Sequence, residues 1–309
     1  MTSTLSIGRA LRIWPPAQQA AYYVILSFAD APFELAASTE RDRLTVDGIS
    51  ALFVGPTSLD SLLGELPPAT APLLIEIPAS LSNSWDLPAT DLSFLRTGPI
   101  RRAVVMSAGS LLLARRLRQR AITEQTSRDG TSFLEFWAPE TAAVLLDELV
   151  TDLIEAPPPD KPRQNAVRRR ALVDRARRRL AQSPEAPHPL PTLADTLGAS
   201  SFHFARLFRS ETGLSVHQYL LRLRMARALR YLTRRDTDLS RLALELGFSS
   251  HSHFTSTFHR EFGVNPAGVR SMLDRERRCA NTRYLAWPTV HRTDADNRAR
   301  ADANQHHSA

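Results

Sequence analysis

The sequence predicts an α+β protein with two domains, and three observations support this fold class. Residues 1–155 contain short apolar runs, rich in β-branched and aromatic residues, that proline, glycine and aspartate separate; this pattern is typical of a β-rich domain. Residues 163–275 carry apolar side chains at helical spacing, which predicts an all-α domain. Residues 156–162 hold four prolines and favour a stiff linker, because proline cannot continue a helix.

The β-rich domain is expected to contain strands followed by two helices. The predicted strands are residues 22–28, 49–54, 73–77 and 103–106. The predicted helices are residues 110–120, with basic side chains on the outer face, and residues 139–154, with one apolar stripe. That stripe consists of Leu146, Leu149, Val150 and Leu153. We expect it to pack on its own domain, although it could also pair with a second copy of the chain in a homodimer.

A motif that occurs twice organises the C-terminal half. The first copy consists of Leu193-Ala194, Leu197-Gly198, Ser200, Phe204, Phe208 and Gly213. The second copy consists of Leu242-Ala243, Leu246-Gly247, Ser250, Phe254, Phe258 and Gly263. The offset between them is 49 residues before the turn and 50 after it, so the second copy has one extra residue in the turn. Such a repeat predicts two similar helical units.

Each copy predicts a helix, a glycine turn and a second helix. In the first copy, Thr192 and Asp195 resemble a capping box, and Gly198 favours the left-handed conformation that ends a helix. Ser200 can then cap the second helix, whose phenylalanines fall on one face and leave the other face exposed. This is the helix-turn-helix pattern, in which the second helix enters the major groove of DNA. The alternative is a helical bundle that binds no nucleic acid.

Charge is distributed unevenly along the chain. Residues 160–280 contain 23 basic and 11 acidic residues, a net charge of +12, whereas residues 1–159 contain 12 and 18, a net charge of −6. The basic half therefore favours a polyanionic partner. Because Lys161 is its only lysine, nearly all of this charge is guanidinium, which suits bidentate contact with phosphate or guanine. The arginine runs at 168–170 and 177–179 are equally consistent with contact to a polyanion and with solvated helix faces.

Further residues around the repeat carry a family resemblance. In the second copy they are Gly247-Phe248-Ser249, Phe254, Phe258, Glu261-Phe262-Gly263-Val264-Asn265-Pro266 and Arg270. In the first copy and the helix after it they are Phe208, Glu211-Thr212-Gly213-Leu214-Ser215, Tyr219 and Arg224. Over residues 191–270, about a quarter of the chain, the sequence resembles the DNA-binding domain of the AraC/XylS family of bacterial transcription regulators.

The resemblance implies two helix-turn-helix units joined by one long helix, residues 216–232, and an apolar stripe in that segment supports this independently. A stiff connection would place the two reading helices in major-groove segments about one helical turn (~34 Å) apart. In the family, the region that matches residues 1–155 is usually a small β-barrel. We therefore expect a cupin-like barrel with flanking helices, which senses an effector or mediates dimerisation.

The base-contacting residues are expected on two recognition helices, residues 201–211 and 251–261. The candidate DNA-binding residues are Phe202, Ala205, Arg206, Arg209, His251, Ser252, Thr255 and Ser256. Arg206 is the principal candidate, because a bidentate arginine contact to guanine discriminates between bases by about 1–3 kcal/mol. A phosphate contact, which orients without specifying sequence, is the alternative. The short side chains of Ala205 and Ser256 predict weak hydrogen-bond readout, so sequence preference should be concentrated under the first unit.

Catalytic and membrane functions have little support in the sequence. The single Cys279 excludes an internal disulfide, and His251 and His253 lie on different helix faces, so they cannot share a metal. The sequence contains no P-loop, dinucleotide-binding glycine pattern or nucleophile elbow. We expect no catalytic residue, no cofactor and no metal. The apolar runs are shorter than the ~18–20 residues of a membrane span, which favours a cytoplasmic protein, associated with the nucleoid when bound.

The function predicted from these observations is that of a sequence-specific transcription regulator. Its expected partners are double-stranded DNA and RNA polymerase, and its N-terminal domain is expected to modulate binding. A small-molecule effector and a homodimer both remain open, and no effector site is apparent. A nonspecific architectural DNA-binding protein is the alternative, which the weak second reading face supports. Residues 276–309 are polar and lack periodicity, and they are expected to form a disordered tail.

Overall fold

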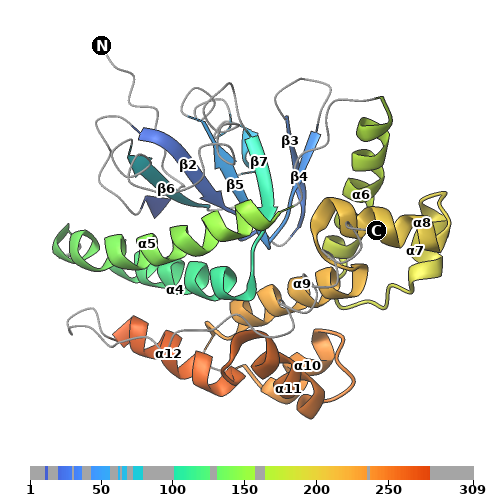
Figure 1. The fold of residues 1–309 in the computed structure, drawn as a ribbon. Coiled ribbons are helices and arrows are strands. Elements are labelled where there is room, and N and C mark those ends of the chain that lie inside the picture. Colours follow the sequence, from blue (N-terminus) through green and yellow to red (C-terminus); the bar gives the residue numbers. More distant parts are fainter. Residues whose placement is uncertain are drawn as a thin grey trace.

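The fold combines sheets and helices in the N-terminal part with a purely helical C-terminal part (Figure 1). The predicted α+β class, with an all-α C-terminal domain, is therefore confirmed. The computed structural model describes residues 11–12, 20–29, 31–36, 43–55, 62, 65–67, 72–78, 101–125, 131–156, 164–234 and 237–278.

Two separate sheets are present in the described residues. The larger contains β1 (Leu11–Arg12), β6 (Leu73–Pro78), β2 (Ala20–Leu26), β5 (Ser50–Val54) and β7 (Arg101–Val105), in that order. Its pairings are antiparallel except for β1 with β6. The smaller pairs β3 (Phe33–Ala36) with β4 (Arg43–Val46). The predicted strands correspond to β2, β5, β6 and β7, and closure of a cupin-like barrel stays a prediction.

One apolar core of the N-terminal part lies between the larger sheet and two helices, α4 (Ala108–Gln125) and α5 (Thr131–Glu155) (Figure 1). A second apolar cluster joins the alternate residues of the larger sheet, such as Ile25 and Leu52, to Leu35 and Val46 of the smaller sheet. The apolar stripe predicted on the second helix belongs to the first core. Its exposed fractions are 1% at Leu146, 0% at Leu149, 6% at Val150 and 2% at Leu153. The stripe therefore packs within its own chain, as the pattern favoured.

The basic outer face predicted for α4 is wrong, because these arginines are covered. Arg115 is 6% exposed and Arg120 is 2% exposed. The guanidinium groups of Arg115 and Arg118 lie 4.8 and 4.9 Å from the centre of the Phe28 ring. Burial, together with the charge of Arg118, lowers the pKa of Arg115 to about 9. The arginines of α4 thus serve contacts within the chain, partly because C-terminal helices pack along this helix.

The C-terminal part consists of a series of helices, with α9 in its middle (Figure 1). They are α6 (Gln164–Gln182), α7 (Leu190–Thr196), α8 (Ser201–Thr212), α9 (Val216–Tyr231), α10 (Leu239–Glu245), α11 (His251–Phe262) and α12 (Pro266–Arg278). α12 continues past residue 275, so residues 276–278 are helical and do not belong to the expected tail, whose other residues lie outside the described ones. The reason is that Glu276 is held against α4. The domain boundaries at 155 and 163 stay predictions.

Candidate nucleic-acid interface

The first helix-turn-helix unit consists of α7, a glycine turn and α8. Gly198 in the turn has a φ of +71°, in the left-handed region that glycine adopts without strain. Ser200 caps α8 by accepting a hydrogen bond from the backbone N–H of His203 at 3.4 Å. Phe204 and Phe208 are both 0% exposed, with ring centres 5.8 Å apart. One face of α8 therefore packs inward, as its spacing predicts.

The start of α7 differs from the sequence prediction. The helix begins at Leu190, after Pro189, and no side chain caps it. The capping box expected from Thr192 and Asp195 is therefore not formed. The reason is that Pro191 fits the first turn, where a missing N–H costs nothing, so the helix starts ahead of Thr192.

The second unit repeats this construction with α10 and α11. Gly247 has a φ of +79°, and Ser250 accepts a hydrogen bond from the backbone N–H of His253 at 3.1 Å. Phe254 and Phe258 are again 0% exposed, with ring centres 5.7 Å apart. The two copies of the motif thus share their local structure as well as their sequence.

One side chain of α9 joins the two units. The Nε of Arg224 donates to the carbonyl oxygen of Pro184 at 2.7 Å, and its Nη1 donates to the carbonyl oxygen of Gly247 at 2.9 Å. Longer bonds reach the carbonyl oxygens of Glu185 and Ala186, at 3.4 and 3.3 Å. The guanidinium group presents several donors in a fixed plane, so it can serve separate backbone segments at once. Arg224 therefore ties the loop before the first unit to the turn of the second.

Gly247 allows this close approach. A Cβ atom at Gly247 would lie 2.2 Å from the carbonyl oxygen of Glu185 and 2.9 Å from Nη2 of Arg224. Gly198, which holds the equivalent position in the first unit, has no such neighbour within 4 Å. Only the second copy therefore requires glycine for packing as well as for its backbone conformation.

The outer face of α8 presents the residues predicted to read the first DNA segment. Phe202 is 80% exposed, Arg206 is exposed and Ala205 is half-buried. Within the described part of the chain, Arg206 makes no hydrogen bond or ion pair, so its guanidinium group is open to a ligand. Arg209 is half-buried, its Nε is enclosed, and it already interacts within the chain. Phe202 and Arg206 are therefore the most prominent side chains of this face.

The outer face of α11 is polar, and none of the residues predicted to read DNA there is an arginine. Of the predicted residues, His251, Ser252 and Ser256 are exposed and Thr255 is half-buried. A shallow hollow of about 540 Å³ is lined by His251, Ser252, Thr255, Ser256, His259 and Asn265. The hydroxyl group of Ser256 donates to the carbonyl oxygen of Ser252 at 2.7 Å, so its proton is used within the helix.

Two residues of this hollow were absent from the site predicted from the sequence. His259 follows Thr255 by four residues and so shares its helix face, a spacing that could have identified it. Asn265 lies beyond the end of α11, where no helical spacing applies, and only the folded chain brings it to the hollow. Cys279 lies outside the described residues.

Two other features are absent from the described parts of the chain. No helix within them is long and apolar enough to cross a membrane. Nor do these residues bring together three or more histidine, cysteine, aspartate or glutamate side chains in a group that could hold a metal ion.

Two matched helix-turn-helix units define the C-terminal part as a double helix-turn-helix domain. Comparison with known proteins identifies its relatives. Residues 193–272 match the family described as "Helix-turn-helix domain". The HTH-type transcriptional activator RhaR of Klebsiella pneumoniae is 31% identical over 105 residues, 34% of this chain and 37% of that protein. The HTH-type transcriptional activator RhaS of Shigella boydii is 34% identical over 82 residues, 26% of this chain and 30% of that protein.

The chain thus matches about a third of the length of these curated relatives. A solved structure of an AraC-type transcriptional regulator from Chromobacterium violaceum is 28% identical, with a TM-score of 0.32, and covers 34% of this chain and 93% of that one. On the family match and the two relatives, the C-terminal region of this chain is an AraC-type helix-turn-helix domain.

Proposed function

We propose that this chain is a sequence-specific transcription regulator, in which α8 and α11 insert into successive major-groove segments of double-stranded DNA. The observation that carries the proposal is the pair of matched units with exposed outer faces, Phe202 and Arg206 on α8 and His251 and Ser252 on α11. Such helices fit the major groove and can contact base edges there. Arg224 ties the units together, which supports binding of both to one face of DNA.

The N-terminal domain modulates this binding, and RNA polymerase is the protein partner of such a regulator. The two reading faces contribute unequally. Arg206 donates in bidentate fashion to guanine, whereas α11 offers small polar groups and the methyl group of Thr255 for contact with thymine. Most sequence preference therefore lies under α8.

The test of this function is selection of bound sequences from a random DNA pool, with the full-length protein at near-physiological salt. We expect one motif about two helical turns long. A repeated motif would add that the protein binds as a dimer. Salt-sensitive binding without any motif would contradict the proposal, because phosphate contacts alone produce that behaviour.

Substitution of Arg206 tests the assignment of the reading face. Arg206→Ala is expected to weaken binding to the selected site by about 1–3 kcal/mol, roughly 5- to 150-fold, and to flatten base preference under α8. Arg175→Ala is the matched control, because it removes the same charge from an exposed position on α6. Equal losses on selected and random DNA would show that Arg206 contacts phosphate only.

An architectural DNA-binding protein is the second candidate function. The observation that favours it is the α11 face, where no arginine or lysine lines the hollow and the Ser256 proton is used within the helix. Such a protein would prefer no site, whereas a specific regulator should prefer its own site by at least about 10³ over random DNA. Competition between selected and random DNA separates the two.

A further inference from the structure

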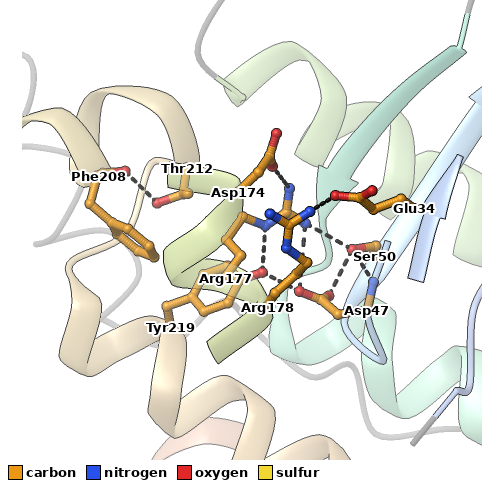
Figure 2. A network of polar contacts seen from close by, with 9 residues as sticks. All are labelled: Glu34, Asp47, Ser50, Asp174, Arg177, Arg178, Phe208, Thr212 and Tyr219. Carbon is orange, nitrogen blue, oxygen red and sulfur yellow. Dashed lines mark hydrogen bonds and ion pairs between the residues drawn. The ribbon is translucent and has the colours of Figure 1, made fainter. Parts of the chain in front are cut away.

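The N-terminal part holds the first helix-turn-helix unit through a buried polar network (Figure 2). Asp47 lies in the turn between β4 and β5, is 0% exposed, and accepts a hydrogen bond from Tyr219 of α9. Arg177 of α6 donates to Tyr219 Oη at 2.7 Å and to Ser50 Oγ at 3.2 Å. Tyr219 then packs edge-on against Phe208 of α8, with ring centres 5.3 Å apart. Buried groups therefore connect the sheet to the core of the first unit.

This first attachment is well enclosed. Tyr219 is 0% exposed and Arg177 is 8% exposed, and Nη2 of Arg177 lies 3.6 Å from Oδ2 of Asp47. Separating the sheet from the first unit would break these hydrogen bonds and this ion pair together. The first unit is therefore attached to the N-terminal part as a fixed body.

A second attachment joins α4 to α12, the helix that follows the second unit. Nε and Nη2 of Arg116 donate to Oε1 of Glu276 at 3.2 and 2.5 Å. Nη1 of Arg120 donates to the main-chain carbonyl oxygen of Glu276 at 3.1 Å. That carbonyl lies in the last turn of α12, where no partner within the helix is present, so Arg120 satisfies it and complements the negative helix end. The side chains of Arg116 and Glu276 remain 12% and 13% exposed, so this attachment is less enclosed than the first.

The second attachment adds a contact with the N-terminal part to those that hold the second unit within the DNA-binding domain. Within that domain, Arg224 ties the second unit to the loop before the first at Gly247, near the start of α11. Met225 and Leu229 of α9 also belong to one buried apolar core with Phe254 and Phe258 of α11. Glu276, near the end of α12, provides a separate point, and α12 packs on α11. Together with the packing of α11 and α12 on α4, this additional point restricts rotation of the second unit relative to the N-terminal part.

We infer that Arg116, Arg120 and Glu276 are positioning residues for DNA recognition, an inference that rests on the proposed function. The N-terminal part is fixed to the first unit, holds α12 through these residues, and so sets the orientation of α11 relative to α8. We call the DNA segments contacted by α8 and by α11 the two half-sites. A shift of α4 would change the separation of half-sites that the protein prefers, without altering any base-contacting residue.

A distance measurement in the absence of DNA tests this arrangement directly. Spin labels at Asp195 of α7 and Ser271 of α12, both exposed, report the separation of the units in the full chain with Cys279→Ser. We expect one narrow distance distribution, which broadens in Arg116→Glu, where like charges face each other. The charge swap, Arg116→Glu with Glu276→Arg, should narrow it again. An unchanged distribution in Arg116→Glu would overturn the inference.

DNA with two half-sites at varied separation then tests the consequence for recognition. Wild-type protein is expected to bind DNA with one separation about tenfold more tightly than DNA with the others. In Arg116→Glu this ratio of affinities should fall to about threefold or less, and the charge swap should restore it. Arg275→Ala, at the exposed neighbour of Glu276, is the control and should keep the wild-type preference. A broadened distance with an unchanged separation preference would overturn the positioning role. If wild-type protein selects no sequence at all, the proposed function fails, and the distance measurement still decides whether α4 orients the second unit.

Discussion

Replacement of Arg224 by alanine is expected to destabilise the helical domain. The loss should exceed that caused by replacing an arginine of α9 that makes only a surface contact. The residue makes two short hydrogen bonds to backbone carbonyl oxygens, at 2.7 Å to Pro184 and 2.9 Å to Gly247. A hydrogen bond from a charged donor contributes about 1.5–3 kcal/mol. Because the bond to Gly247 lies at an exposed position, we assign about 1.5 kcal/mol to each of the two bonds. The expected loss of unfolding free energy is therefore about 3 kcal/mol.

Arg227 provides a matched control on the same helix. Its Nη1 contacts Oε2 of Glu185 at 2.5 Å, and the two side chains are 29% and 43% exposed. An ion pair at the surface contributes about 0–1 kcal/mol, so Arg227→Ala should cost little. Arg224→Lys should fall between the two alanine variants, because one ammonium group keeps the charge but cannot span Pro184 and Gly247 together.

Urea unfolding of the full-length variants, followed by far-UV circular dichroism, measures these differences, since the C-terminal part is helical. With a slope of about 1–3 kcal/mol per molar urea, a loss of about 3 kcal/mol lowers the midpoint by about 1–3 M. Equal shifts for Arg224→Ala and Arg227→Ala would refute the reasoning, because only the former breaks the connection between the two units.

Two further predictions concern the turn and the buried network. Gly247→Ala should lower the melting temperature more than Gly198→Ala, because both pay the left-handed penalty of about 1–2 kcal/mol but only the former places a Cβ 2.2 Å from the Glu185 carbonyl oxygen. Burial raises the pKa of Tyr219 well above its ordinary value. The neutral phenol is thus favoured in the fold, and its contribution is complete below about pH 10 and is lost as the pH rises further. Urea unfolding at pH 9 to 11.5 should show a steeper loss for wild type than for Tyr219→Phe; parallel curves would contradict this.

The interior of the two units could be predicted from the sequence because it depends on local spacing. Phe204 and Phe208 lie four residues apart, so any helix places them on one face, and both are fully buried. Gly198 and Ser200 determine the turn through their own backbone and capping preferences. The short strands β1, β3 and β4 were not predicted, because two to four residues are too few for an alternating pattern to emerge.

The contacts between the two parts of the chain could not be predicted in the same way. Arg177 and Ser50 are separated by 127 positions, and Arg116 and Glu276 by 160. No local pattern relates residues so far apart, and a charged side chain carries no sign of its eventual partner. The run of arginines at 177–179 is therefore equally consistent, in the sequence, with a solvated face and with the buried network that Arg177 forms.

Net charge consequently overstates how many arginines are available for the proposed contact with DNA. An arginine has five donors and no acceptor, so it serves a buried carbonyl group as well as a phosphate. Arg222 donates to the carbonyl oxygen of Met106 at 2.7 Å, Arg177 belongs to the network with Asp47, and Arg224 bonds backbone carbonyls. These guanidinium groups join the helices of the domain to each other and to the sheet. The salt dependence of DNA binding should therefore reflect the smaller set of exposed arginines that contact phosphate, and not the net charge of residues 160–280.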